Sequence, residues 1–179
     1  MQTVLSRCVL INFPSVDKER LFEYIKTNHP DEIENSELLN SLCQGVIGEL
    51  EKILSDPDYF SLREESFKML SPLLSKHKIT AYSITSFLEE HKEKTEQIFD
   101  FWISFLRDIM MLKNKNSKNI INQDMQEDIR KLSQSIDDNF PIIALEQLFV
   151  AKTMLRKYVN LHNLSLNLSF SIKKRLYQK

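Results

Sequence analysis

The scarcity of glycine is the feature of this sequence that most restricts its fold. Only Gly45 and Gly48 occur among 179 residues, together with five prolines. The tight turns of sandwiches and barrels rely on positive φ angles, which glycine adopts most easily. Long stretches rich in Leu, Ile, Lys and Glu make up most of the chain. We therefore expect an all-α protein.

One segment departs from this pattern. "TVLSRCVLINF", residues 3–13, is a dense apolar run interrupted only by Ser6, Arg7 and Cys8. Such a run predicts a strand that is buried inside a sheet. No comparable segment follows, so the sequence contains one predicted strand without a partner.

The rest of the chain predicts amphipathic helices. Three short helices are expected first, with Ser15 or Asp17 capping one helix and Ser36 another. "SDPDYF", residues 55–60, is the clearest linker signal. Pro72 is expected to kink or end the helix that contains it. The longest apolar stripe follows three- and four-residue steps and consists of Ile98, Phe101, Trp102, Phe105, Ile109 and Leu112.

The C-terminal segment fits two patterns. Leu164, Leu166, Leu168, Phe170 and Ile172 alternate with polar residues, as in a half-buried strand, yet several of the same residues also share helical spacing. A lone strand beside a helical bundle leaves its backbone groups without partners. We therefore predict a helix that is apolar on two sides and can offer a second packing surface.

Charge and motifs exclude several classes of function. The formal net charge is −1, so a globally basic nucleic-acid surface is absent. No glycine-rich phosphate loop occurs, and Cys8 and Cys43 form no metal-binding pattern with the histidines. We expect no enzymatic activity of the chain by itself, no cofactor and no metal. The absence of a secretory signal and of a long apolar run predicts a cytoplasmic protein.

Arg7 is the residue for which a catalytic role is conceivable. A guanidinium held on a rigid strand is suited to reach a phosphate that a neighbouring protein of the same assembly binds. Such an arginine finger stabilises charge on a transferred phosphoryl group in trans. By residue type alone, an arginine at this position is more often a surface residue.

The N-terminal part resembles AAA+ clamp-loader subunits. "TVLSRC" is similar to their Ser-Arg-Cys motif, and "VLINFPSVDKERLFEYI" matches the passage from the last core strand into a three-helix lid. "SLCQGVIGELEKIL", residues 41–54, resembles the third lid helix, where ATP-binding subunits have an arginine after the glycine. Here Gly45 to Gly48 contain none. The resemblance thus favours the family's subunit that does not hydrolyse ATP.

The C-terminal part resembles the collar domain of DNA polymerase III delta-prime subunits. The family's Trp-x-x-x-x-Arg-Asp helix matches Trp102, Arg107 and Asp108. Its Asn-x-Asp loop and late Val-Asn pair match Asn122 with Asp124 and Val159 with Asn160, although the proline that usually follows the pair is missing.

This resemblance implies a domain organisation and a set of partners. Residues 1–13 would be the remnant of the AAA+ core, 14–60 the lid and 61–179 the collar, in a fragment whose other core strands lie upstream. The implied function is that of a stator, which assembles with ATPase (gamma/tau) and delta subunits to load the sliding clamp onto primed DNA. Leu164, Leu166 and Phe170 are the candidate collar interface residues, and Arg7 would face the ATP of a neighbour.

Two other functions are compatible with the sequence. One is an all-helical adaptor, unrelated to replication, that binds a peptide or a partner helix in a groove around Trp102, although the Trp102 stripe more often indicates a core. The other is a fragment of an ATP-hydrolysing clamp-loader protein, which an intact phosphate loop upstream of this chain would indicate.

Overall fold

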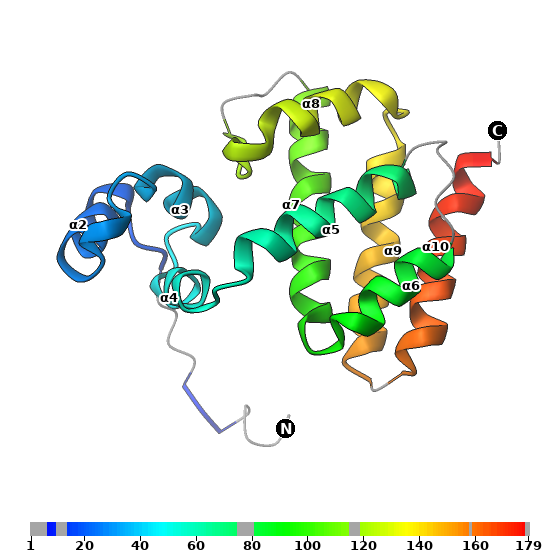
Figure 1. Ribbon diagram of the computed structural model, residues 1–179, viewed down its shortest axis with the longest axis horizontal. Coiled ribbons are helices and arrows are strands. Elements are labelled where there is room, and N and C mark those ends of the chain that lie inside the picture. Colours follow the sequence, from blue (N-terminus) through cyan, green and yellow to red (C-terminus); the bar gives the residue numbers. More distant parts are fainter. Residues whose placement is uncertain (1–6, 10–13, 75–80, 115–118, 158, 178–179) are drawn as a thin grey trace. The chain divides into compact units, whose positions relative to one another are not determined.

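A computed structural model of the chain describes residues 7–9, 14–74, 81–114, 119–157 and 159–177. Every regular element within these ranges is a helix, which confirms the all-α prediction (Figure 1). Most of the predicted strand, residues 3–6 and 10–13, lies outside the described ranges. The chain divides into two compact units, Met1–Ser55 and Asp56–Lys179. Among the described residues, no helix combines the length and apolarity needed to cross a bilayer.

Unit 1 is built from three helices around a small apolar core. They are α2 (Lys18–Asn28), α3 (Ser36–Cys43) and α4 (Ile47–Ser55), with the short 3-10 helix η1 (Pro30–Glu32) after α2. Asp17 caps α2 as predicted, because its Oδ1 accepts a hydrogen bond from the Arg20 amide at 2.9 Å. Ser36 is the first residue of α3 and does not cap it; the N-cap position is occupied by Asn35.

The turn between α3 and α4 requires glycine at one position. Gly45 has a φ of +77°, and a Cβ there would lie 2.4 Å from the carbonyl oxygen of Val16. The Val16 amide donates to the Gly45 carbonyl at 2.8 Å, so the chain before α2 is attached to this turn. Gly48, in α4, has open space around it.

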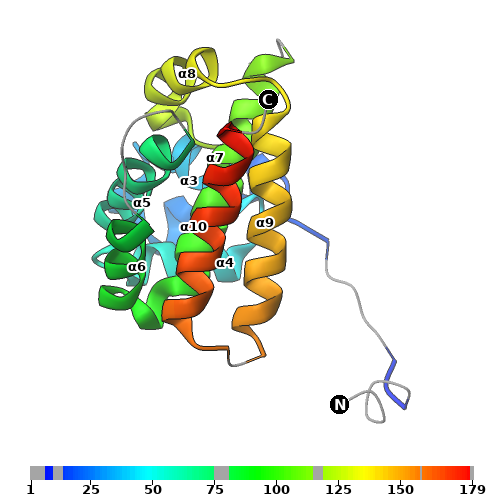
Figure 2. The ribbon, with the colours of Figure 1, turned by 90° about the vertical axis from the view of Figure 1, so that its right-hand side faces the viewer.

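Unit 2 contains six α-helices in its described residues. They are α5 (Tyr59–Leu74), α6 (Ala81–Glu90), α7 (Thr95–Lys113), α8 (Gln126–Ser135), α9 (Phe140–Leu155) and α10 (Leu161–Tyr177), with 3-10 turns η2 (Lys92–Lys94) and η4 (Gln123–Met125). Helix α7 is central and packs against α5, α8 and α9, while α10 packs against α6 and α9 (Figures 1 and 2).

The predicted Trp102 stripe forms the core of unit 2. Ile98, Trp102, Phe105 and Ile109 on α7 are fully buried. Trp102 is thus a core residue, and its indole does not line an exposed groove. Burial of these large side chains is the main stabilisation of the unit.

One boundary differs from the prediction, and the predicted helix breaker Pro72 can be placed. The expected linker of residues 55–60 is shorter, because Tyr59 and Phe60 already form the first turn of α5. Pro72 lies inside α5, two residues before its end.

The C-terminal segment is helical, as predicted. Leu164, Leu168 and Ile172 are buried in the core, whereas Phe170 is exposed. Burial thus follows the three- and four-residue helical spacing rather than the two-residue alternation of a strand.

Candidate subunit-assembly surface

The sequence motifs of unit 2 come together in a buried polar cluster. Asp108 on α7 is fully buried, and its carboxylate accepts hydrogen bonds from the backbone amides of Ile121 at 3.1 Å and Asn122 at 2.8 Å. The side-chain amide of Asn122 also donates to Asp108, at 2.7 Å. The segment that leads into α8 is therefore attached to α7 by one carboxylate.

Arg63 on α5 completes the cluster. Its side chain is 2% exposed, and its guanidinium donates to Asp124 at 2.6 and 2.9 Å and to Asn122 Oδ1 at 2.7 Å. The guanidinium also lies 5.6 Å from the ring centre of Phe105. Because a buried guanidinium is stable only when it is paired, these contacts fix the segment before α8 against α5 as well as α7.

The other motif residues have comparable roles. Trp102 donates its indole N–H to the Ser66 carbonyl at 2.8 Å, and Arg107 donates to Asp108 at 2.9 Å. Asn160 precedes α10, and its Oδ1 accepts from the Asn163 amide at 3.2 Å, as an N-cap does. These motif residues thus connect helices within unit 2, and the side chains at the centre of the cluster are buried and hydrogen-bonded, whereas Val159 is exposed.

The surface suited to assembly lies on α9. Its exposed apolar side chains share one side of the helix, and we call them the α9 face: Ile142, Phe149, Val150 and Met154. Phe149, the largest, is 53% exposed. The opposite side of α9, with Ala144, Leu148 and Ala151, is buried. The core of the unit is therefore complete without the α9 face, as expected of a surface that binds another protein.

Ion pairs fix α9 against α7. Lys152 pairs with Asp100, and Arg156 donates to Glu96 at 2.6 Å. The hydrogen bond from Arg156 lowers the pKa of Glu96 below its ordinary value. The α9 face is thus presented on a helix that is held in place at its C-terminal half.

The three predicted interface residues of the tail have different environments. Leu164 is buried in the unit's own core and Leu166 is half-buried. Phe170 is 61% exposed and presents its ring at the surface. A role for these residues in assembly stays a prediction, with Phe170 the most accessible of the three.

The predicted Ser-Arg-Cys motif lies at the edge of the described residues. Arg7 and Cys8 are exposed, and Ser6 lies outside the described ranges. The arginine-finger role of Arg7 stays a prediction.

Sequence reasoning missed Arg63 and the α9 face. An arginine among polar neighbours looks like a surface residue, and only the fold brings it to Asn122 and Asp124, 59 and 61 residues later. The α9 face had a signal in the sequence: apart from Glu146, Gln147, Lys152 and Thr153, residues 140–155 are apolar, which is more than one buried stripe needs.

Comparison with known families identifies unit 2. No curated protein and no solved structure matches the chain. Residues 57–169 match the model of the family described as DNA polymerase III, delta subunit, C terminal. This match covers more than half of the chain, from just before α5 into α10. The chain therefore belongs to this family, that of the C-terminal domains of DNA polymerase III delta subunits, and is related to the subunits of clamp loaders.

Proposed function

We propose that this chain is the stator, or delta-prime, subunit of a bacterial clamp loader. Unit 2 is its collar, through which it assembles with the ATPase (gamma/tau) and delta subunits. The complete assembly loads the sliding clamp onto primed DNA. In this proposal residues 1–13 are the remnant of the AAA+ core, residues 14–60 the lid, and residues 61–179, nearly all of unit 2, the collar.

The α9 face carries this proposal. It consists of four large apolar side chains on one helix within the segment that matches the family model. Contiguous exposed apolar side chains on a soluble domain usually mark a protein interface. Phe170 on α10, the helix next to α9, adds a further exposed aromatic ring.

Two features of the N-terminal part favour the stator over an ATPase subunit. The turn from Gly45 to Gly48 contains no arginine that could contact a nucleotide. Arg7 is exposed, as a residue acting on the ATP of a neighbour must be.

The test is co-assembly with purified gamma/tau and delta subunits of the same organism, measured by size-exclusion chromatography with light scattering. The wild-type chain should elute with them as a defined complex. Phe149→Glu should abolish or strongly reduce co-elution, since a buried unpaired carboxylate opposes association. Tyr82→Glu is the control, because Tyr82 on α6 is exposed but lies outside the α9 face.

If the wild-type chain elutes separately from the gamma/tau and delta subunits, even at high protein concentration, the proposal is contradicted and the helical adaptor is favoured. If the Phe149→Glu and wild-type chains co-elute equally well, the α9 face is not the surface through which the chain assembles. Arg7→Ala, tested in the same assembly, should leave co-elution intact and slow ATP hydrolysis by the neighbouring subunit.

A further inference from the structure

Two charged side chains accompany the apolar side chains of the α9 face. Glu146 on α9 and Lys157, in the turn directly after α9, are both exposed. Glu146 lies four residues after Ile142 and four before Val150, so it shares their side of the helix. Eleven residues, or three helical turns, separate Glu146 from Lys157, and Arg156 between them keeps a helical backbone conformation. The two charges therefore lie on one side of α9, toward opposite ends of the α9 face.

Both charges are open to a partner. Neither side chain forms a hydrogen bond or an ion pair with the residues that the structure describes. The other basic side chains of this region differ, because Lys152 pairs with Asp100 and Arg156 pairs with Glu96. Glu146 and Lys157 are thus charges that the fold of unit 2 does not use itself.

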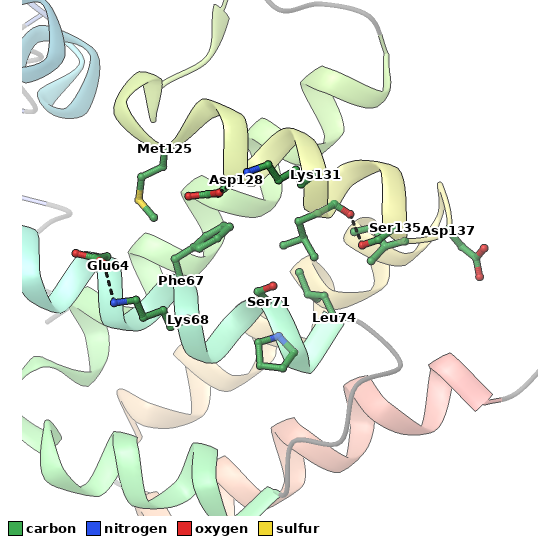
Figure 3. Close-up of a pocket in the computed structure, with 13 residues that line it drawn as sticks. Glu64, Phe67, Lys68, Ser71, Leu74, Met125, Asp128, Lys131, Ser135 and Asp137 are labelled. Atoms are coloured by element: carbon green, nitrogen blue, oxygen red, sulfur yellow. Dashed lines mark hydrogen bonds and ion pairs between the residues drawn. The ribbon is translucent and has the colours of Figure 1, made fainter.

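The groove between α5 and α8 has a different character (Figure 3). Each lysine at its rim already has an acidic partner one turn away on its own helix: Lys68 pairs with Glu64, and Lys131 pairs with Asp128. Its apolar floor, of which Phe67 is a part, is buried within unit 2. The α9 face, by contrast, combines exposed apolar side chains with charges of both signs that have no partner in the described residues.

The order of these charges makes the α9 face complementary to itself. When two copies of α9 lie side by side in opposite directions, the Glu146 end of one copy meets the Lys157 end of the other. A two-fold axis repeats every contact, so two Glu–Lys pairs form, one at each end of the interface. A parallel pair would instead bring like charges together. Opposite directions also place the two helix dipoles favourably.

Apolar side chains fill the space between the two charges. Phe149, Val150 and Met154 lie between Glu146 and Lys157 in the sequence, and each is between 41% and 53% exposed. In an antiparallel pair these side chains lie near the two-fold axis, where the second copy removes them from water. Because each copy contributes few side chains, the interface is small and the association is weak and reversible.

We infer that the α9 face binds the α9 face of a second copy of this chain, in an antiparallel and isologous dimer with two Glu146–Lys157 pairs. The dimer itself does not depend on the proposed function. One consequence does rest on that function: the dimer covers the assembly surface, so a free chain must dissociate from its copy before it joins the gamma/tau and delta subunits.

Charge reversal in the full-length chain tests the inference by sedimentation velocity. Glu146→Lys and Lys157→Glu should each weaken self-association several-fold, because each substitution places like charges together at both ends of the interface. An equal mixture of the two variants should associate as well as the wild type, since every pair between unlike copies then joins a lysine to a glutamate. The double variant Glu146→Lys, Lys157→Glu should do the same.

Two substitutions outside the α9 face are the matched controls. Glu90→Lys on α6 and Lys174→Glu on α10 change exposed charges in the same way and should leave self-association unchanged. Circular dichroism and Trp102 fluorescence check that each variant is folded. A wild-type chain that stays monomeric at its highest soluble concentration would overturn the inference. So would a mixture of the two single variants that associates no better than either variant alone.

Cross-linking checks the direction of the two helices. All variants carry Cys8→Ser, which removes the exposed cysteine and leaves Cys43 buried. Thr153 lies near the middle of the contact, so a short bismaleimide reagent should join two copies of Thr153→Cys. In an antiparallel pair the two copies of Ile142→Cys are about 28 Å apart along the helices and should not be joined. Efficient cross-linking through Ile142→Cys would contradict the antiparallel arrangement.

The outcomes separate this inference from the proposed function. Self-association that is restored by mixing the charge variants, without co-assembly with gamma/tau and delta subunits, contradicts only the proposed function. Co-assembly of a chain that does not self-associate contradicts only the dimer.

Discussion

Arg63, near the start of unit 2, forms a two-pronged hydrogen-bonded ion pair with Asp124, 61 residues further along the chain. Through Asn122 the same guanidinium is connected to Asp108. Three segments, α5, α7 and the turn before α8, are thereby joined by one polar cluster. Several expected properties of the protein depend on it.

Replacing Arg63 should destabilise unit 2 strongly. Arg63→Met removes the guanidinium that donates to the buried Asn122 side chain and to the partly exposed Asp124, and a buried acceptor left without its donor costs about 1–3 kcal/mol. Urea unfolding followed by Trp102 fluorescence measures the change. Arg130→Met is the control, since the Arg130–Glu127 pair on α8 is exposed; it should change the free energy of unfolding by less than about 0.5 kcal/mol. Similar effects of the two substitutions would contradict the role of the cluster.

Asp108→Asn should loosen the segment before α8. The asparagine side chain has an NH2 group in place of one carboxylate oxygen. This donor then faces N–H donors that the carboxylate accepts in the wild type, such as the Ile121 and Asn122 amides, at a cost of about 1–3 kcal/mol. Hydrogen exchange of the Ile121 and Asn122 amides should accelerate more than exchange in the middle of α9. Asp128→Asn, at an exposed position on α8, is the matched control. Unchanged exchange of both amides in Asp108→Asn would show that these hydrogen bonds contribute little.

The two glycines should respond in opposite directions to alanine. Gly45→Ala forces a side chain into a positive-φ position and against the Val16 carbonyl, so it should destabilise unit 1 by about 1–2 kcal/mol or more. Gly48→Ala meets open space within α4 and should stabilise it by up to about 1 kcal/mol. Hydrogen exchange of the α2 and α4 amides measures both changes. A stabilising Gly45→Ala would contradict the described turn.

Acid should weaken unit 2 through two carboxylates. Hydrogen bonds from Lys94 and Arg156 lower the pKa values of Asp56 and Glu96 below their ordinary values of 3.8 and 4.5. Because these pKa values are lower in the folded chain than in the unfolded chain, the ionised carboxylates stabilise the folded state. This stabilisation is complete at pH values above the ordinary pKa values, and it is lost as the pH falls through the pKa values of the folded chain. Stability should therefore begin to decrease below about pH 4.5.

Carbon-13 NMR titration of the carboxyl groups tests the assignment of these shifts. Lys94→Met should return the pKa of Asp56 toward its ordinary value and leave Glu96 unchanged. Arg156→Met should do the reverse. A pKa of Asp56 that stays low in Lys94→Met would contradict the assigned cause.

Local pattern was sufficient to predict most helices. The spacing of Ile98, Trp102 and Phe105 predicted a buried helix, because side chains three and four residues apart lie on one side of a helix wherever it packs. Asp17 was predicted as a cap for a similar reason, since capping depends on residues within one turn. The helical C-terminal segment followed from the requirement that backbone groups be paired.

The roles of residues that are distant in sequence were decided by the tertiary structure. Trp102, Asp108 and Asn122 were singled out by a family resemblance, yet their hydrogen-bond partners depend on how α5, α7 and the turn before α8 are brought together. Leu164 and Phe170 belong to the same apolar pattern, and only packing against α6 and α9 buries one and exposes the other. The sequence determines where helices form because their hydrogen bonds are local. The buried charge pairs, and the choice of which side of α9 stays exposed, arise from long-range packing, and so they are decided only in the folded chain.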